Sequence, residues 1–190
     1  MARFNGDDEF DSENILERIA RSTTNQGKAH EMMRAGREIV HRDQGHAIIY
    51  YDGALELFES DGDMTGAAYA TIAIGFAHSH RGAWAEAAVA YGKAIDFART
   101  ASRTDIEIDS TFFKGRCHRN RNDIGEAANL MGHALASAVE VTYPFQGIIR
   151  LEYGRLLRKM GRSEDAIEVL EPAIEEAREN DPGNFLPALI

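Results

Sequence analysis

The sequence predicts an all-α solenoid, which is a row of stacked helix–turn–helix repeats. Pairs of alanines recur along the chain with a nearly constant step: Ala47/Ala54, Ala87/Ala94, Ala127/Ala134 and Ala166/Ala173. Two further columns keep the same steps, one bulky (Tyr51, Tyr91, Met131, Leu170) and one small (Ala35, Gly75, Gly115, Gly154). Small residues let two helices cross closely and a bulky residue fills the space beside them, so these columns indicate packed helix pairs.

The chain before the repeats divides into two short segments. Residues 1–11 are acidic and polar, so we expect a disordered acidic tail there. Residues 12–26 are predicted to hold an N-terminal capping helix, with Ile15, Leu16 and Ile19 on one face. Because the end of a solenoid exposes an apolar face, we expect this helix to cover the first repeat.

Residues 27–183 are predicted to form four helix pairs. In the unit from Gly66 to Phe97, the second helix carries an apolar stripe at helical spacing, and Gly82 marks the turn before it. The run Asn180–Gly183 predicts the end of the last helix. Residues 184–190, NFLPALI, form an apolar C-terminal tail that folds back over the last repeat, docks into a neighbouring chain, or belongs to a longer array.

Several of these residues together resemble the signature of the tetratricopeptide repeat (TPR) family. In the second unit they are Ile74, Gly75, His78, Gly82, Trp84, Ala87, Tyr91 and Ala94. Leu157, Gly161, Ala166, Leu170 and Ala173 resemble the signature nearly as well. The resemblance implies a right-handed superhelix whose concave surface is lined by the first helix of each pair and binds protein or peptide segments.

The repeats also depart from that signature. Lys114 and Asn122 stand where the pattern prefers an apolar residue and a glycine. The period of about 40 residues exceeds the usual value of about 34, and we expect the surplus to lengthen the second helix of each pair. Units of this length are similar to those of peptide-sensing regulators and motor-associated adaptors within the family.

Composition excludes several classes of partner and location. A net charge of −10 argues against nucleic acid as a partner, since phosphate contacts need clustered Lys and Arg. No stretch approaches the length of a membrane-spanning helix, and the start MARFNGDDEF does not have the form of a secretory signal. The single cysteine, Cys117, fits a reducing compartment, so we expect a cytoplasmic protein.

Motifs for catalysis or for metal binding are not evident. The sequence has no nucleophile elbow, phosphate-binding loop or zinc-ligand spacing, so we predict no enzyme activity, no cofactor and no metal site. Cys117 is expected to be a buried small hydrophobe. His78 and His80, two positions apart, do not share a helix face.

The resemblance directs attention to the exposed face of the first helices. Adding the period along the chain gives the candidate partner-binding residues Tyr69, Ile72, Phe76, Phe112, Arg116, Arg119, Leu151, Arg155 and Arg158. This groove is apolar at its N-terminal end and arginine-rich at its C-terminal end. The planar fork of arginine suits carboxylates, so an acidic and apolar segment is the expected ligand. Alternatively, the arginines neutralise glutamates of adjacent repeats, such as Glu152, and bind nothing.

These observations favour a non-catalytic scaffold or adaptor that binds a partner protein or peptide. The lysines that grip a carboxylate in the best-known pocket of the family are replaced here by Met32, Ile72, Phe112 and Leu151, so that chaperone-binding function is not expected. Two alternatives remain open. One is a regulator that senses a peptide, and the other is a structural subunit that forms a homo-oligomer through residues 184–190.

Overall fold

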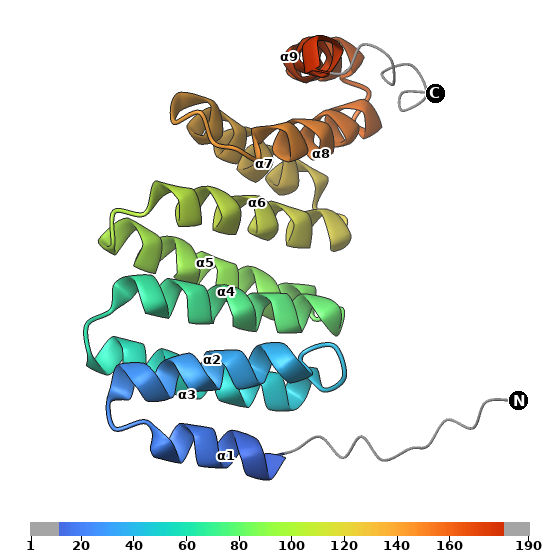
Figure 1. Cartoon of the computed structure of the whole chain (residues 1–190). Helices are drawn as coiled ribbons and strands as arrows, with labels where there is room; N and C mark the ends of the chain where they lie inside the picture. The colour runs from blue at the N-terminus through green and yellow to red at the C-terminus, as the bar shows by residue number, and fades with distance from the viewer. Residues whose placement is uncertain (1–11, 181–190) are drawn as a thin grey trace, which may run out of the picture.

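The structure is a computed structural model that describes residues 12–180 of the 190, with side chains for residues 15–175. Within this range the chain forms nine helices and no strand, stacked in one row (Figure 1). The helices are α1 Ser12–Arg21, α2 Asn25–Ile39, α3 Gln44–Ser60, α4 Met64–His80, α5 Trp84–Thr100, α6 Thr104–Asn120, α7 Ile124–Glu140, α8 Gln146–Lys159 and α9 Ser163–Asn180. The predicted all-α solenoid is confirmed, whereas the predicted tails at 1–11 and 184–190 lie outside the described residues.

The helices form four antiparallel pairs behind an N-terminal helix. We call α2, α4, α6 and α8 the inner helices and α3, α5, α7 and α9 the outer helices. Helix α1 packs on α2 through Ile15, which is buried, and through Arg18, whose guanidinium contacts Glu31 at 3.0 Å and Glu38 at 3.3 Å. None of the helices in the described part of the chain is long and apolar enough to cross a membrane.

The extra length of the repeat is shared between both helices of a pair. Helices α3 to α7 contain 17 residues each and are joined by short turns, so that α4 begins at Met64 and α6 begins only at Thr104. A unit of about 34 residues with the same turns has about 14 residues in each helix. The prediction that only the second helix is longer is therefore wrong.

A small residue on each inner helix receives a bulky residue from the outer helix of the same pair. A Cβ atom added at Gly75 would lie 2.9 Å from the Tyr91 ring, and one at Gly154 would lie 2.7 Å from Leu170. In the first pair the residue opposite the Tyr51 ring is Gly36, where an added Cβ atom would overlap the ring, and not the neighbouring Ala35 that the period selects. The turn after α2, residues 40–43, is also one residue longer than the three-residue turns that join most of the helices.

Most of the turns end the preceding helix in the same way. Six of them contain a residue in the left-handed region: Gly62, Gly82, Ser102, Asn122, Thr142 and Gly161. The N–H of the following residue donates to a carbonyl in the last turn of the helix, as Arg103 does to Ala98 at 2.9 Å. This bond satisfies a carbonyl that the end of a helix leaves without a partner. Ser102, with φ of 54°, adopts this conformation at a cost that a glycine does not have.

We therefore expect Ser102→Gly to stabilise the fold. Relief of the left-handed strain is worth about 1 kcal/mol, or roughly 2–4 °C in the melting temperature of a protein of this size. Gly62→Ser is the matched reverse change, because Gly62 occupies the equivalent place one unit earlier with φ of 72°, and it should lower the melting temperature similarly. Calorimetry of both variants checks this, and a less stable Ser102→Gly protein contradicts it.

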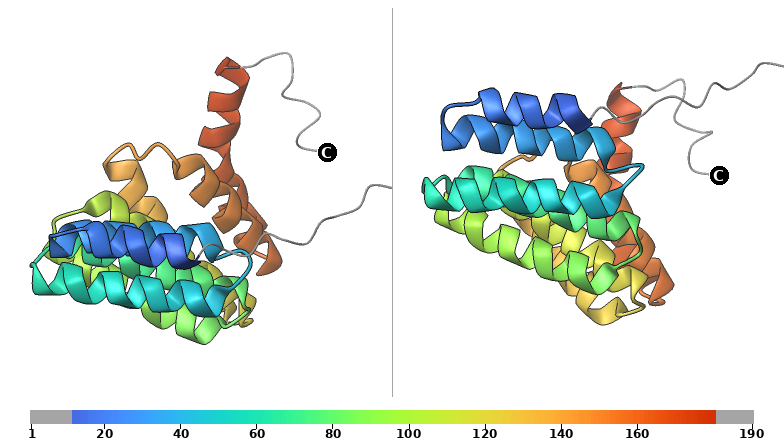
Figure 2. Two further views of the ribbon diagram at one scale, coloured as in Figure 1. Left: turned by 60° about the horizontal axis from the view of Figure 1, so that its bottom comes forward. Right: turned by 90° about the horizontal axis from the view of Figure 1, so that it is seen from below.

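The last helix pair, α8 and α9, is arranged differently from the other three pairs. A longer connection, residues 141–145, joins α7 to α8, and it includes Pro144 and the exposed Phe145. Helix α9 crosses α8 and rises toward the side of the row on which the inner helices α2 and α4 lie (Figure 2). Pro172 lies inside α9 on its exposed side.

Candidate binding groove

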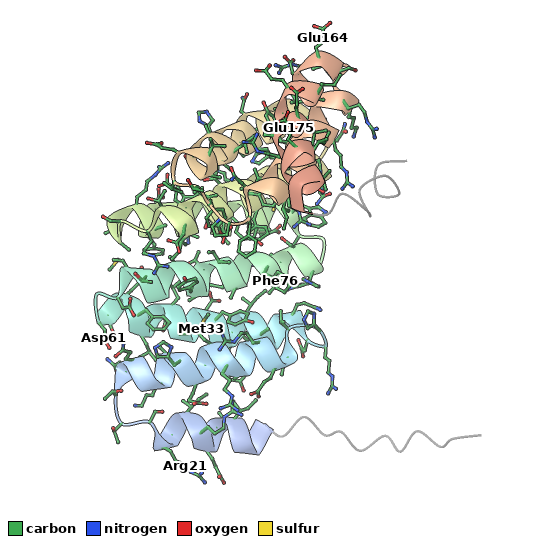
Figure 3. All side chains as sticks on the ribbon, turned by 45° about the horizontal axis from the view of Figure 1, so that its top comes forward. Arg21, Met33, Asp61, Phe76, Glu164 and Glu175 are labelled. Atoms are coloured by element: carbon green, nitrogen blue, oxygen red, sulfur yellow. The ribbon has the colours of Figure 1, made fainter. Side chains whose placement is uncertain are left out.

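Two adjoining cavities open on the face of the inner helices. The larger has a volume of about 710 Å³ between α2 and α4, with Tyr51 and Phe58 of α3 contributing to its wall. The smaller, of about 310 Å³, lies between α4 and α6 and includes Trp84, the first residue of α5. Phe76 and Phe113 line both cavities. We call the two cavities together the groove, and Figure 3 labels Met33 and Phe76 on its α2 and α4 walls.

Three rings form an apolar platform where α2 and α4 end. Phe76 lies 4.3 Å from the ring of His80 and 6.2 Å from that of His41, measured between ring centroids, and the two imidazoles are 5.3 Å apart. The sequence places these rings together because the inner helices run in the same direction, so that His41 after α2 and His80 at the end of α4 are neighbours. Phe76 remains 39% exposed, which leaves its face available to a ligand.

The smaller cavity combines aromatic walls with one cationic group. The Phe113 ring stacks on Tyr91 with centroids 5.5 Å apart. The guanidinium carbon of Arg116 lies 5.9 Å from the Phe113 ring and 6.0 Å from the Phe112 ring, within the range of a cation–π contact. Arg116 is exposed and forms no ion pair with any residue that the structure describes. The rings therefore support a cation whose N–H groups are available to an acidic ligand.

Several of the predicted groove residues lie where the sequence places them. Tyr69, Ile72, Phe76 and Arg116 line the two cavities, with Ile72 half-buried and the other three exposed. Leu151 is 42% exposed and Arg158 is exposed, but both lie on α8, beyond the cavities. The apolar end of the predicted surface is thus a concave site, whereas its α8 end is an open helix face.

Phe112 does not belong to the groove. It is only 6% exposed and packs in a core cluster with Ala127 and Met131 of α7. The neighbouring Phe113 lines the groove instead. The repeat period did not identify Phe113 as a groove residue, because the equivalent residue of the second unit is the small Ala73. Sequence reasoning also missed His41, Trp84 and Asn120, which reach the cavities from a turn and from helix ends.

Glu152 forms ion pairs with two of the four arginines that were predicted to line the groove. It forms ion pairs with Arg119 of α6 and with Arg155 of α8, the latter at 3.1 Å. Glu152 is half-buried, so the pairs hold α6 and α8 together at this end. The alternative that arginines neutralise a neighbouring glutamate therefore applies to Arg119 and Arg155, and Arg116 and Arg158 are the two without an ion pair to a described residue.

At their other ends the inner helices are joined by two equivalent hydrogen bonds. Arg103, in the turn before α6, donates to the Tyr69 hydroxyl at 3.1 Å, and Tyr143, in the connection before α8, donates to Asp109 at 2.8 Å. The two donors occupy equivalent positions in successive units, and so do the two acceptors. Burial, together with repulsion from Asp105, raises the pKa of Asp109. These bonds fix the spacing of the inner helices under the groove.

The raised pKa of Asp109 predicts a pH-dependent stability. Because this pKa is higher in the folded chain than in the unfolded chain, ionisation of Asp109 costs stability above it, and the cost disappears as pH falls through it. We expect Asp109→Asn, whose amide oxygen still accepts from Tyr143, to raise the free energy of unfolding at pH 7 and to lose this advantage toward pH 4. Urea denaturation at a series of pH values measures the difference.

Asp96→Asn is the control for this experiment, because Asp96 is exposed on the outer helix α5. Its stability relative to the parent protein should not follow the same course with pH. An Asp109→Asn protein that is less stable than the parent throughout the pH range contradicts the prediction.

The side chains that could support chemistry do not gather into a reactive site in the described part of the chain. No group of three or more His, Cys, Asp or Glu side chains among these residues is placed to hold a metal ion. Cys117 is buried, and burial raises the pKa of its thiol. A third cavity, of about 460 Å³, lies on the outer face between α5 and α7, where Arg99 and Glu107 form an ion pair at 2.7 Å.

Comparison with known proteins shows the fold. No family model and no curated protein matches the sequence. Among solved structures, aspartyl phosphate phosphatase F from Bacillus subtilis superposes with a TM-score of 0.77 at 12% identity, over 87% of this chain and 44% of that one. A Rap protein in complex with competence and sporulation factor gives 0.74 at 16% identity, over 94% of this chain and 53% of that one.

A third structure resembles the chain over most of both lengths. A putative kinesin light chain with nearly identical TPR-like repeats, from Podosopora anserina, gives a TM-score of 0.68 at 13% identity, over 83% of this chain and 78% of that one. At such identities the similarity establishes a TPR-like helical solenoid. The chain spans about half the length of the first two proteins.

Proposed function

We propose that this chain is a non-catalytic TPR-like scaffold whose groove binds a peptide or protein segment that combines apolar and acidic groups. The observation that carries the proposal is Arg116, which is supported by aromatic rings and has no ion pair with a described residue, beside the exposed Phe76. The exposed ring can bind an apolar side chain, and the guanidinium can bind a carboxylate next to it.

The size and the charge of the groove support a ligand of this kind. Cavities of about 710 and 310 Å³ are of the size that binds several side chains. Arg116 stands out in a chain of net charge −10, because the surrounding field repels acidic ligands elsewhere and leaves this cation as a preferred contact. On α8, the exposed Leu151 can make a further apolar contact and the exposed Arg158 can bind a further carboxylate.

One alternative has support from the comparisons. The Rap protein was solved in complex with competence and sporulation factor, which favours the alternative that this chain senses a peptide. The long step between successive inner helices fits the longer repeats of peptide-sensing regulators and motor-associated adaptors. A homo-oligomer formed through residues 184–190 concerns residues outside the described part and stays a prediction.

Selection from a displayed library of random linear peptides tests the groove. We expect enriched peptides to share large apolar residues next to Asp or Glu. Arg116→Glu should lower their affinity roughly 10-fold to 100-fold, since a hydrogen bond between charged groups contributes about 1.5–3 kcal/mol. Phe76→Asp should lower the affinity as well, because it places a carboxylate on the apolar platform. Fluorescence polarisation with labelled selected peptides measures both losses.

Matched controls use exposed residues of the outer helix α5. Val89 is 63% exposed and Lys93 is exposed, so Val89→Asp and Lys93→Glu make the same changes of charge away from the groove. Both controls should bind the selected peptides as the parent protein does. Peptides that bind equally well to the Arg116→Glu protein show that the groove is not their site, and an absence of any consensus also counts against the proposal.

A further inference from the structure

Helix α9 brings the chain to the groove side of the molecule. In Figure 1 it is seen end-on, and in both views of Figure 2 it runs from the side of the outer helices to the side on which α2 and α4 lie. Its last residue is Asn180. The described part of the chain therefore ends on the side on which the two cavities open.

The sequence after α9 has the chemistry that the groove is proposed to bind. Glu179 and Asp181 are acidic, and the stretch that follows, NFLPALI, contains four large apolar residues: Phe185, Leu186, Leu189 and Ile190. On the inner face, the aromatic cavities lie between α6, α4 and α2, and Arg116 lines the smaller of them.

The segment is long enough to reach the cavities. Ten extended residues span at most about 33–36 Å. Neighbouring packed helices lie about 8–10 Å apart, so the path from α8 across α6 to α4 is roughly 20 Å. The apolar residues 185–190 can therefore reach the smaller cavity.

We propose that residues 181–190 bind in the groove of their own chain, with the apolar side chains in the smaller cavity between Phe76 and Phe113. This inference rests on the proposed function, because it names a ligand for the same site. It has a consequence for regulation, since an external peptide must displace the segment before it binds. The segment thus lowers the apparent affinity of the groove for an external peptide and raises the peptide concentration that is needed to fill the groove.

The single tryptophan of the chain reports on the smaller cavity. Trp84 lines this cavity, so its fluorescence responds to whether the cavity holds apolar side chains or water. In the full chain, the double substitution Phe185→Ser with Leu186→Ser should shift the emission of Trp84 to longer wavelength and increase its quenching by acrylamide. Ile167→Ser is the control, since Ile167 is 65% exposed on α9 and does not line the groove, and its emission should equal that of the parent.

A synthetic peptide of residues 181–190 provides the second arm of the test. Added to the double variant, it should return the Trp84 emission to that of the parent chain. Light scattering should give a monomer for the parent at every concentration, because binding within one chain does not depend on dilution. Trp84 emission that is the same in parent and double variant, or a difference that disappears on dilution together with a dimer, overturns the proposal.

The outcome is separable from that of the proposed function. If selected peptides bind the parent chain through Arg116 but the double substitution leaves both Trp84 and peptide affinity unchanged, only the intramolecular ligand is wrong. If the inference is right, the double variant binds the selected peptides more tightly than the parent does, and the Ile167→Ser protein binds them as the parent does.

Discussion

The contact between a bulky outer-helix residue and a small inner-helix residue determines how the whole row is packed. Tyr91 against Gly75 is one example, because the ring leaves no room for even one methyl group on the inner helix. A glycine inside a helix costs roughly 0.5–1 kcal/mol relative to alanine. The close packing of a nearly fully buried Tyr91 offsets that cost, and the same contact recurs between Leu170 and Gly154 in the last pair.

This spacing also determines what the groove contains. Once the inner helices are packed at fixed distances, hydrogen bonds such as Tyr143 to Asp109 join them at one end and Glu152 joins α6 to α8 at the other. The side chains left between these contacts, including Phe76 and Arg116, are then held by a rigid frame. A ligand gains affinity from such a surface because little ordering remains to be done on binding.

The architecture follows from the sequence because the repeated small and bulky residues act within one helix pair. The burial of a residue that packs against a neighbouring helix does not follow from the repeat period alone. The period gives Phe112 the environment of Ile72, yet Phe112 packs against Met131 and is buried, and Phe113 reaches the groove in its place. It likewise selects Ala35, although Gly36 meets the Tyr51 ring, because a shift of one residue rotates a helix face by about 100°.

Amide hydrogen exchange with a selected peptide tests the central claim most directly, namely that the face of the inner helices is the binding surface. The account predicts slower exchange in α4 and α6 around Phe76 and Arg116 when the peptide is bound. It predicts no change around the outer cavity, where Arg99 pairs with Glu107. Protection confined to α5 and α7 at that outer cavity, with none in α4, would contradict the account.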